Sequence, residues 1–194
     1  MSKILSSEIH PAILPATPIL ISAGGVQGKP NDINLGWTGI LCFNPPLIGL
    51  SLKPSRYAYA LIEETEDFVA NIPTTTMLEQ FDQCDMAATQ IRDKFEMVGL
   101  TPMPARDVGA PLIEECPVNV ECRVEKMIRL GGTHDLLVSR AVAVHFDEDV
   151  VNDAGELIIE KIRPFVMCPG SGEFWDLGRE IGHVGFTASK KNLY

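Results

Sequence analysis

The sequence predicts a mainly β protein of the α+β class: an antiparallel barrel, closed or split, with helices inserted into it. Short stretches that alternate apolar and polar residues are separated by turn signals, which is typical of antiparallel strands. The helical patterns are inserted between groups of strands and do not alternate with single strands, so β-α-β units are not expected. Gly24, Gly25 and Gly28 miss the G-x-G-x-x-G spacing because position 23 is Ala, which argues against a dinucleotide-binding fold.

The first half of the chain is predicted to form short strands and one helix. Loop signals rich in Gly, Pro, Asn and Asp fill residues 24–32, and Asn44-Pro45-Pro46 forms the next turn. Between these signals the expected elements are strands at 17–23, 34–43 and 47–53, a helix at 56–64 and a strand at 67–73.

The middle of the chain is predicted to be helical. Residues 76–79 (TMLE) match a capping box, and the apolar residues that follow keep helical spacing. A second helical pattern ends before Gly99, which is a typical residue just beyond a helix C-terminus. The two apolar faces consist of Met77, Phe81 and Cys84, and of Ile91, Phe95 and Val98.

The second half returns to strands. Residues 118–124 alternate regularly, and the tight LGGTHD reversal leads into 136–146, so these two stretches should form a long antiparallel hairpin. A turn at 152–155 (NDAG) precedes a short strand expected at 157–162. The tail, residues 172–186, is predicted to form a short helix that carries aromatic residues.

Length and composition limit the possible classes of protein. The 194 residues are expected to form one domain, 1–194, with 45% hydrophobic and 22% charged residues. The formal net charge of −10 argues against binding to nucleic acid or an anionic membrane, because no surplus of cations is available to neutralise phosphates. Since no apolar run reaches the length of a membrane span and the N-terminus has no secretory pattern, a cytoplasmic protein is expected.

The five cysteines do not predict a metal site. They are odd in number and widely spread, and they form no C-x-x-C pair near histidines. Reduced thiols in a reducing compartment are therefore expected.

A phosphate site is predicted where the strand at 47–53 meets the helix at 56–64. Ser55 occupies the expected N-cap position, and Arg56 is expected to be the first helical residue. Helix N-termini bind phosphate readily, and Ser51 and Lys53 approach from the strand, so the four side chains could hold one phosphate monoester. The alternative is a capped surface helix whose Lys and Arg are only solvated.

The ordered combination of several segments resembles the flavin reductase-like family of FMN-binding split barrels, which includes the flavoredoxins. The resemblance extends over nearly the whole chain. It rests on NLGWTGILCFNPPLIGLSLKPSRYAYALIEETEDFVANIPT, DKFEMVGLTP, APLIEECPVNVECRV, GGTHDLLVSRAVAVHFDED and GEFWDLGREIGHVGF. It implies a Greek-key antiparallel split barrel along which FMN lies, with the phosphate near the start of the Arg56 helix.

The resemblance also implies which residues hold the cofactor. Residues of the strand at 34–43 should line the flavin, and Asn71 should offer its amide or backbone to the ring edge. The implied cofactor-binding set is Asn34, Trp37, Thr38, Gly39, Ser51, Lys53, Ser55, Arg56, Tyr57 and Asn71. Trp37 could instead be a core aromatic residue, and Asn71 could be an outward-facing polar residue at a strand end.

Three further positions follow from the same resemblance. His134 matches a family histidine that would orient a nicotinamide or donate to reduced flavin, although a plain turn histidine is the alternative. Cys84 could be a redox thiol, and the preferred interpretation is a buried cysteine on a helix face. Ala58 stands where family members often carry Ser or Thr, and the segment after Cys84 lacks their usual Gly and Ser.

The function implied is that of an FMN-dependent oxidoreductase, of the NAD(P)H:flavin reductase type or of the flavoredoxin type that transfers electrons. The electron donor would be NAD(P)H or a protein, and the protein would be a homodimer. Two alternatives stay open: a flavin-binding electron carrier without turnover of its own, and a barrel without cofactor that serves as a binding module. Ala58 favours the last.

Overall fold

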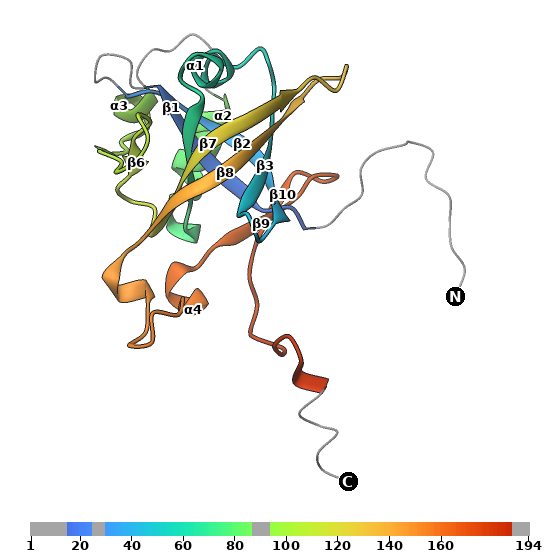
Figure 1. Cartoon of the computed structure of the whole chain (residues 1–194). Helices are drawn as coiled ribbons and strands as arrows, with labels where there is room; N and C mark the ends of the chain where they lie inside the picture. The colour runs from blue at the N-terminus through green and yellow to red at the C-terminus, as the bar shows by residue number, and fades with distance from the viewer. Residues whose placement is uncertain (1–14, 25–29, 87–93, 188–194) are drawn as a thin grey trace.

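The computed structural model describes residues 15–24, 30–86 and 94–187, and its centre is a closed antiparallel barrel (Figure 1). The strand order is β1-β2-β3-β8-β7-β4, and β4 pairs again with β1. The barrel strands are β1 (Pro18–Gly24), β2 (Pro30–Cys42), β3 (Leu47–Leu52), β4 (Asp67–Ile72), β7 (Val118–Ile128) and β8 (Asp135–Phe146). The predicted fold class, a mainly β barrel with inserted helices, is confirmed.

The barrel interior is built by the alternation visible in the sequence. In β3, Leu50 and Leu52 are buried in the core, where Ile48 packs against them from a half-buried position. Gly49 and Ser51, the residues between them, belong to the outer face. Because side chains of a strand alternate between two faces, the register of β3 fixes which residues of β2 and β8 share that outer face.

Helix α1 (Tyr57–Thr65) closes one end of the barrel, where Figure 1 shows it lying across the strands. Its buried residues, Ala58, Tyr59, Leu61 and Ile62, belong to the same core cluster as the barrel strands. Burying this apolar stripe stabilises a helix of only nine residues, which would be marginal in isolation. The helix ends at Glu66, which adopts the left-handed conformation and donates its N–H to Ile62.

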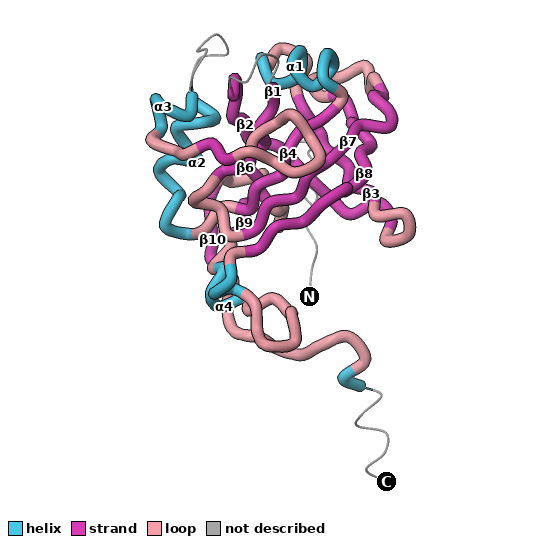
Figure 2. The backbone as a smooth tube through the Cα atoms, turned by 60° about the vertical axis from the view of Figure 1, so that its left-hand side comes forward, coloured by secondary structure: helices cyan, strands magenta, loops and turns pink. Residues whose placement is uncertain are grey.

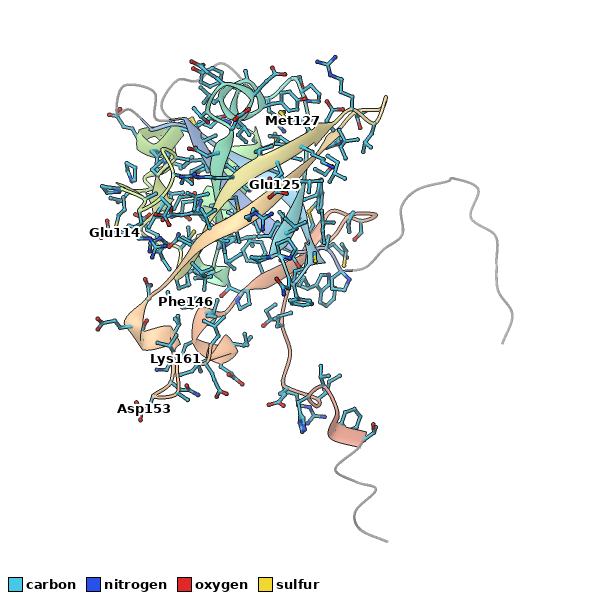
Figure 3. All side chains as sticks on the ribbon, viewed as in Figure 1. Glu114, Glu125, Met127, Phe146, Asp153 and Lys161 are labelled. Carbon is cyan, nitrogen blue, oxygen red and sulfur yellow. The ribbon has the colours of Figure 1, made fainter. Side chains whose placement is uncertain are left out.

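The predicted hairpin of β7 and β8 is present and forms the longest ladder of the barrel. Met127 lies toward the turn of this hairpin and Phe146 at the other end of β8 (Figure 3). Register shifts at Glu121/Cys122 and at Val124/Lys126 interrupt the ladder. Such bulges increase the local twist that a barrel needs in order to close.

A second layer packs against the outside of β1 and β2 (Figure 2). It consists of the 3-10 helix η2 (Thr75–Met77), α2 (Leu78–Met86) and α3 (Lys94–Val98). Phe81 packs edge-to-face against Phe165 and Phe174, with ring centroids 5.2 and 5.6 Å away. The helical turn begins earlier than the predicted capping box, because the Thr74 side chain accepts from the N–H of Thr76. Ile91 of the second helical pattern lies outside the described residues.

Two predicted elements near the C-terminus are wrong. Residues 157–162 contain the short helix α4 (Ile159–Ile162), which ends at Arg163 in the left-handed conformation. Residues 173–176 form β10 (Glu173–Asp176), which pairs with β9 (Phe165–Cys168), where a helix was expected. Phe174 explains the second error, because its ring completes the aromatic cluster and this contact is not local in sequence.

The remaining elements are small: β5 (Pro102–Met103), β6 (Leu112–Ile113) and the 3-10 helix η3 (Glu148–Val150). After β10 the chain leaves the barrel as an extended arm, visible in Figures 1 and 2. Within the described ranges, no helix has both the length and the apolar character needed to cross a membrane.

Candidate functional site

The outer face of β2, β3 and β8 carries the first part of the candidate site. Trp37 lies opposite Ser51, and Ser51 lies opposite Leu136, so these three residues form one row across the strands. The next row begins with Gly39, and a Cβ built there would meet nothing within 4 Å. The face is therefore shallow beside Trp37, which suits a flat ring system.

The register separates Thr38 from this face. Thr38 pairs with Leu50, whose side chain is fully buried in the core, so the Thr38 side chain belongs to the interior face of β2. Only the Thr38 backbone can serve a ligand on the outer face. Asn34 of β2 lies opposite Ile21 of β1, and the side chain of Asn34 is not among those described.

Three basic side chains converge beside the Trp37 face, and we call Lys53, Arg56 and His134 the cation corner. Lys53 follows β3 directly, and the N–H of Arg56 donates to its carbonyl oxygen at 3.0 Å. The pKa of His134 is lowered, first by burial and then by the positive charges of Lys53 and Arg56. The lowered pKa favours the neutral imidazole at pH 7, and the Nδ1 of this ring lies 2.9 Å from the Thr133 hydroxyl.

At the start of α1, two backbone N–H groups that could bind a phosphate already have acceptors within the protein. The N-cap is Arg56, without a side-chain capping bond, so the helix begins one residue later than expected and Ser55 is an exposed turn residue. The N–H of Ala58 donates to Asp32 at 2.8 Å, and that of Tyr59 to the Arg56 carbonyl at 3.1 Å. An anion at this corner would thus be held mainly by side chains.

A buried ion pair is connected to the cation corner through the first turn of α1. Lys94 of α3 lies 2.9 Å from Asp32 of β2, and both side chains are fully buried. The Lys94 ammonium also donates to the Ile33 carbonyl at 3.1 Å. Because Asp32 accepts from Ala58 as well, this pair connects α3 and β2 to the first turn of α1. A buried pair with such additional hydrogen bonds fixes geometry, whatever its net effect on stability.

Arg56 has a protein partner of its own. Its guanidinium donates to the Asp85 carboxylate at 2.6 Å and to the Asp85 carbonyl oxygen at 3.1 Å. These two bonds fix the side chain between α1 and the end of α2. A guanidinium has five N–H groups, so donors remain for a ligand.

Helix α1 carries two tyrosines, Tyr59 and Tyr57, of which Tyr57 is predicted to hold the cofactor. Tyr57 is half-buried and packs against the barrel core. Tyr59 is buried, and its hydroxyl donates to Asp135 at 2.9 Å. Burial and this contact raise the Tyr59 pKa. Tyr59 therefore anchors the helix, and the cofactor role of Tyr57 stays a prediction.

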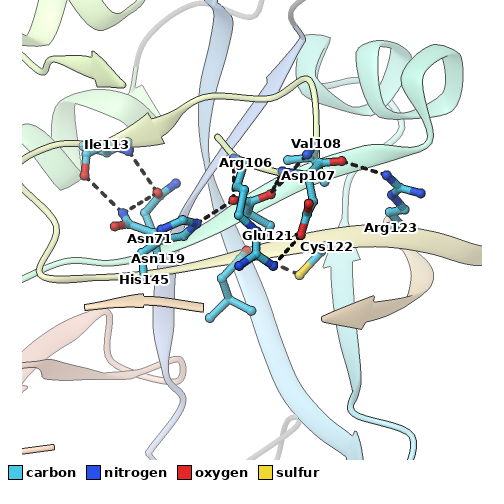
Figure 4. Close-up of polar contacts among 11 residues, drawn as sticks. Asn71, Arg106, Asp107, Val108, Ile113, Asn119, Glu121, Cys122, Arg123 and His145 are labelled. Carbon is cyan, nitrogen blue, oxygen red and sulfur yellow. Dashed lines mark hydrogen bonds and ion pairs between the residues drawn. The ribbon is translucent and has the colours of Figure 1, made fainter. Parts of the chain in front are cut away.

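Asn71, predicted at the flavin ring edge, lies in a different polar network (Figure 4). Its Nδ2 donates to the Leu20 carbonyl and to Ser22 Oγ, both at 3.0 Å. Its Oδ1 accepts from Ile113 and from Asn119. Every hydrogen-bonding atom of this buried amide has a protein partner, so its side chain is not available to a ligand in this arrangement.

Asn71 is one of three side chains that hold the segment 106–113 against the barrel, and we call Asp67, Asn71 and Glu121 the clamp. Asp67 accepts from two backbone N–H groups of the segment, at 2.8 and 3.3 Å. Glu121, fully buried, accepts from three consecutive ones at 2.8, 2.6 and 3.1 Å, and His145 lies 2.5 Å away (Figure 4). The donors to Asp67 and Glu121 are Arg106, Asp107, Val108, Gly109 and Ala110.

Cys84 has the properties of a core residue. It is fully buried on α2 in the cluster that contains Phe81 and Phe95. Burial raises the pKa of its thiol to about 12, so almost no thiolate forms at neutral pH. This agrees with the preferred interpretation, a buried helix-face cysteine.

A separate cavity of about 700 Å³ lies between α4 and the C-terminal arm. Arg163, Asp176, Arg179 and Ile181 are among its lining residues, and none of the predicted cofactor residues is. One of its walls is the exposed arm itself. We therefore place the candidate site at the cation corner, where basic side chains can bind an anion.

The residues at the corner fit a flavin mononucleotide. The two permanent cations, Lys53 and Arg56, can bind a phosphate monoester by charge-assisted hydrogen bonds. The shallow face around Trp37 and Gly39 is open to a ring system beside them. Sequence reasoning missed Asp85, Asp32 and the paired role of Lys94, because nothing in the linear pattern connects residues so far apart.

Comparison with known proteins identifies the family. The model of the flavin reductase like domain matches residues 12–166. An uncharacterized protein of Archaeoglobus fulgidus is 35% identical over 62% of this chain and 67% of its own length. The structure is similar to the flavoredoxin of Desulfovibrio vulgaris (Miyazaki F), with a TM-score of 0.87, 28% identity and coverage of 97% of this chain and 100% of the flavoredoxin.

A flavoredoxin from Methanosarcina acetivorans shares the fold, with a TM-score of 0.86 and 24% identity over 98% of this chain and 100% of its own. The residues that match the family model include all six strands of the barrel and the cation corner. The chain belongs to the flavin reductase-like family, whose fold is a flavin-binding split barrel.

Proposed function

We propose that this protein binds FMN at the cation corner and works as an FMN-dependent oxidoreductase. The observation that carries the proposal is the position of Lys53 and Arg56 at the edge of the shallow Trp37 face. A phosphate held by the two cations would leave the attached ring system over the outer face of β2 and β3. FMN, when bound, supplies the capacity to accept and donate electrons or a hydride.

The role of the chain's own residues would be to bind FMN and to orient it. Lys53 and Arg56 neutralise the phosphate, while the Ser51 and Ser55 hydroxyls are near enough in sequence to add hydrogen bonds. Trp37 offers an aromatic surface, and the missing side chain at Gly39 keeps the approach open. His134, neutral at pH 7, can donate one N–H to a polar edge near the phosphate end.

The electron donor we propose is NAD(P)H or a protein. The site lies on an outer face of the barrel, so a second molecule can reach it without a separate nucleotide-binding domain. Such an open face suits partners that bind briefly and leave. The five cysteines, all free thiols, fit a protein of a reducing compartment such as the cytoplasm.

An absorption spectrum of the purified protein tests the proposal. We expect a yellow protein that releases FMN, not FAD, because the corner offers one phosphate-sized site. A colourless protein that fails to bind added FMN would refute flavin binding. Steady-state oxidation of NADH and NADPH then separates an enzyme from an electron carrier, since a carrier shows no turnover.

We also propose a homodimer. The C-terminal arm exposes apolar residues far from the barrel: Ile181 is 93% exposed, Val184 is fully exposed and Phe186 is 43% exposed. A second copy of the chain would bury these apolar side chains. Light scattering should give twice the chain mass, and truncation after Asp176 should shift the protein toward monomer. A monomer mass for the full-length chain would contradict this proposal.

A further inference from the structure

We propose that Asp85 is an internal competitor for the phosphate of FMN at Arg56, and thereby sets how tightly this protein binds phosphate-bearing flavins. The inference rests on the proposed function, since it concerns the same corner. Its starting point is that an anionic group already lies on the guanidinium that is expected to bind the phosphate.

The geometry separates two contacts between these residues. One is between the Asp85 carboxylate and Arg56, at 2.6 Å, and the other runs from Arg56 to the Asp85 carbonyl oxygen, at 3.1 Å. Helix α2 has no basic residue in its last turn, so Arg56 supplies the cation that favours a helix C-terminus. The backbone contact holds the guanidinium in place even if the carboxylate moves away.

The Asp85 carboxylate is the more exposed partner of this ion pair. Its side chain is 44% exposed, compared with 16% for Arg56. It can therefore rotate into solvent when a phosphate approaches, at the cost of one partly exposed ion pair. A phosphate monoester and a carboxylate compete for the same N–H groups of the Arg56 guanidinium and repel each other. The two therefore cannot both bind the guanidinium fully at the same time.

The competition discriminates between ligands. FMN must displace the Asp85 carboxylate or tolerate its charge, whereas riboflavin has no phosphate and meets neither penalty. Asp85 thus weakens the preference for FMN over riboflavin and shortens the time for which FMN stays bound. A protein that exchanges its flavin gains from such a residue, because the carboxylate takes over the guanidinium as soon as the phosphate leaves.

The test compares Asp85→Asn with Asp82→Asn, which removes the same charge from an exposed position one turn earlier on α2. Flavin fluorescence titrations at low salt give the Kd of FMN and of riboflavin for the wild type and both variants. We expect Asp85→Asn to bind FMN roughly 3- to 10-fold more tightly, as for loss of one partly exposed like charge, with riboflavin unchanged. The gain should shrink as salt is added and vanish when Arg56→Ala is present.

Weaker binding of FMN by Asp85→Asn would overturn the inference and show that the carboxylate positions Arg56. An equal gain for Asp82→Asn, or an equal shift for riboflavin, would also overturn it, because the effect would then not be specific to the Arg56 guanidinium. If the wild type binds neither flavin, the proposed function fails. Inorganic phosphate then tests the inference alone: phosphorus NMR should show tighter binding by Asp85→Asn, and equal binding would refute it.

Discussion

The barrel carries two polar regions that differ in how far their hydrogen bonds are already used. In the clamp, the Glu121 carboxylate is fully buried and accepts from three backbone N–H groups of the segment 106–113. At the cation corner, Lys53 is exposed, His134 is half-buried and Arg56 holds a partner that is itself 44% exposed. The acceptors of the clamp are already used by protein donors, while the cations of the corner still have N–H groups that can bind a ligand.

This difference separates structural polar residues from binding residues. A buried acceptor whose backbone donors all come from one segment holds that segment in place, and losing it leaves several N–H groups unpaired. A cation at the surface contributes little to folding but can bind an anion. Asn71 illustrates the distinction. It is predicted to be a binding residue at the flavin ring edge, but the hydrogen bonds of its side chain hold parts of the protein together.

The largest effect on stability is expected from Glu121→Gln in the clamp. The amide offers one acceptor oxygen to three backbone donors, so we expect a loss of about 2–4 kcal/mol in the free energy of unfolding. Urea denaturation measures it. Glu125→Gln is the matched control on the same strand, since Glu125 makes only a partly exposed pair with Arg140 and should cost less than about 1 kcal/mol.

The clamp variant should leave ligand selectivity alone: the ratio of FMN to riboflavin affinity should match the wild type. A changed ratio would mean that the two regions are coupled and would break the comparison.

At the cation corner, Arg56→Ala should affect binding more than folding. One charge-assisted hydrogen bond contributes roughly 1.5–3 kcal/mol, so FMN affinity should fall by about 10- to 150-fold. Riboflavin affinity should hardly change, because riboflavin has no phosphate. Isothermal titration with both ligands measures the two constants.

Arg123→Ala is the control for this prediction. Arg123, on β7, is exposed and donates to the Asp107 carbonyl at 2.7 Å, so it contacts the segment held by the clamp and not the cation corner. Its loss should leave both flavins unaffected. Equal losses of FMN and riboflavin in Arg56→Ala would show that Arg56 holds the fold together with Asp85.

The pH dependence of stability should reflect the clamp. Burial alone would raise the pKa of Glu121, but hydrogen bonds from Arg106, His145 and Asp107 outweigh it, and the pKa is lowered. A carboxyl group with a lowered folded pKa contributes stability that is present above its unfolded pKa, about 4.3, and is lost as the pH falls through the folded value.

Urea unfolding at pH 7 and at pH 3.5 should therefore show a smaller drop for Glu121→Gln than for the wild type. The same drop in both proteins would mean that other carboxyl groups dominate acid unfolding.

The smallest effect is expected for His134→Ala. A neutral imidazole that donates one hydrogen bond contributes about 1 kcal/mol, which corresponds to roughly 20 mV for a two-electron couple. Anaerobic redox titration should give a midpoint potential lower by that amount, with the affinity for oxidised FMN little changed. His183→Ala, in the exposed arm, should show no shift. An unshifted midpoint potential for His134→Ala would indicate that His134 is only a turn residue.

Much of the barrel was predictable because the burial of alternating side chains is local information. The alternation around Leu50 and Leu52 fixed the two faces of β3, and the LGGTHD turn located the hairpin of β7 and β8. Two members of the cation corner were predictable for the same reason, since Lys53 and Arg56 are neighbours in sequence, whereas His134 joins them only in the tertiary structure. The short elements near the C-terminus were not, because Phe174 forms β10 only where Phe81 and Phe165 already stand.

By itself, the sequence determined the fold class, the faces of the strands and the cations at the start of α1, since each depends on residues within a few positions of one another. Only the tertiary structure decided that Asp32 occupies the N–H of Ala58, that Asp85 lies on Arg56 and that Asn71 belongs to the clamp. Each of these contacts joins residues from 26 to 42 positions apart. Such contacts depend on how the barrel closes, and no local pattern of apolar and polar residues encodes them.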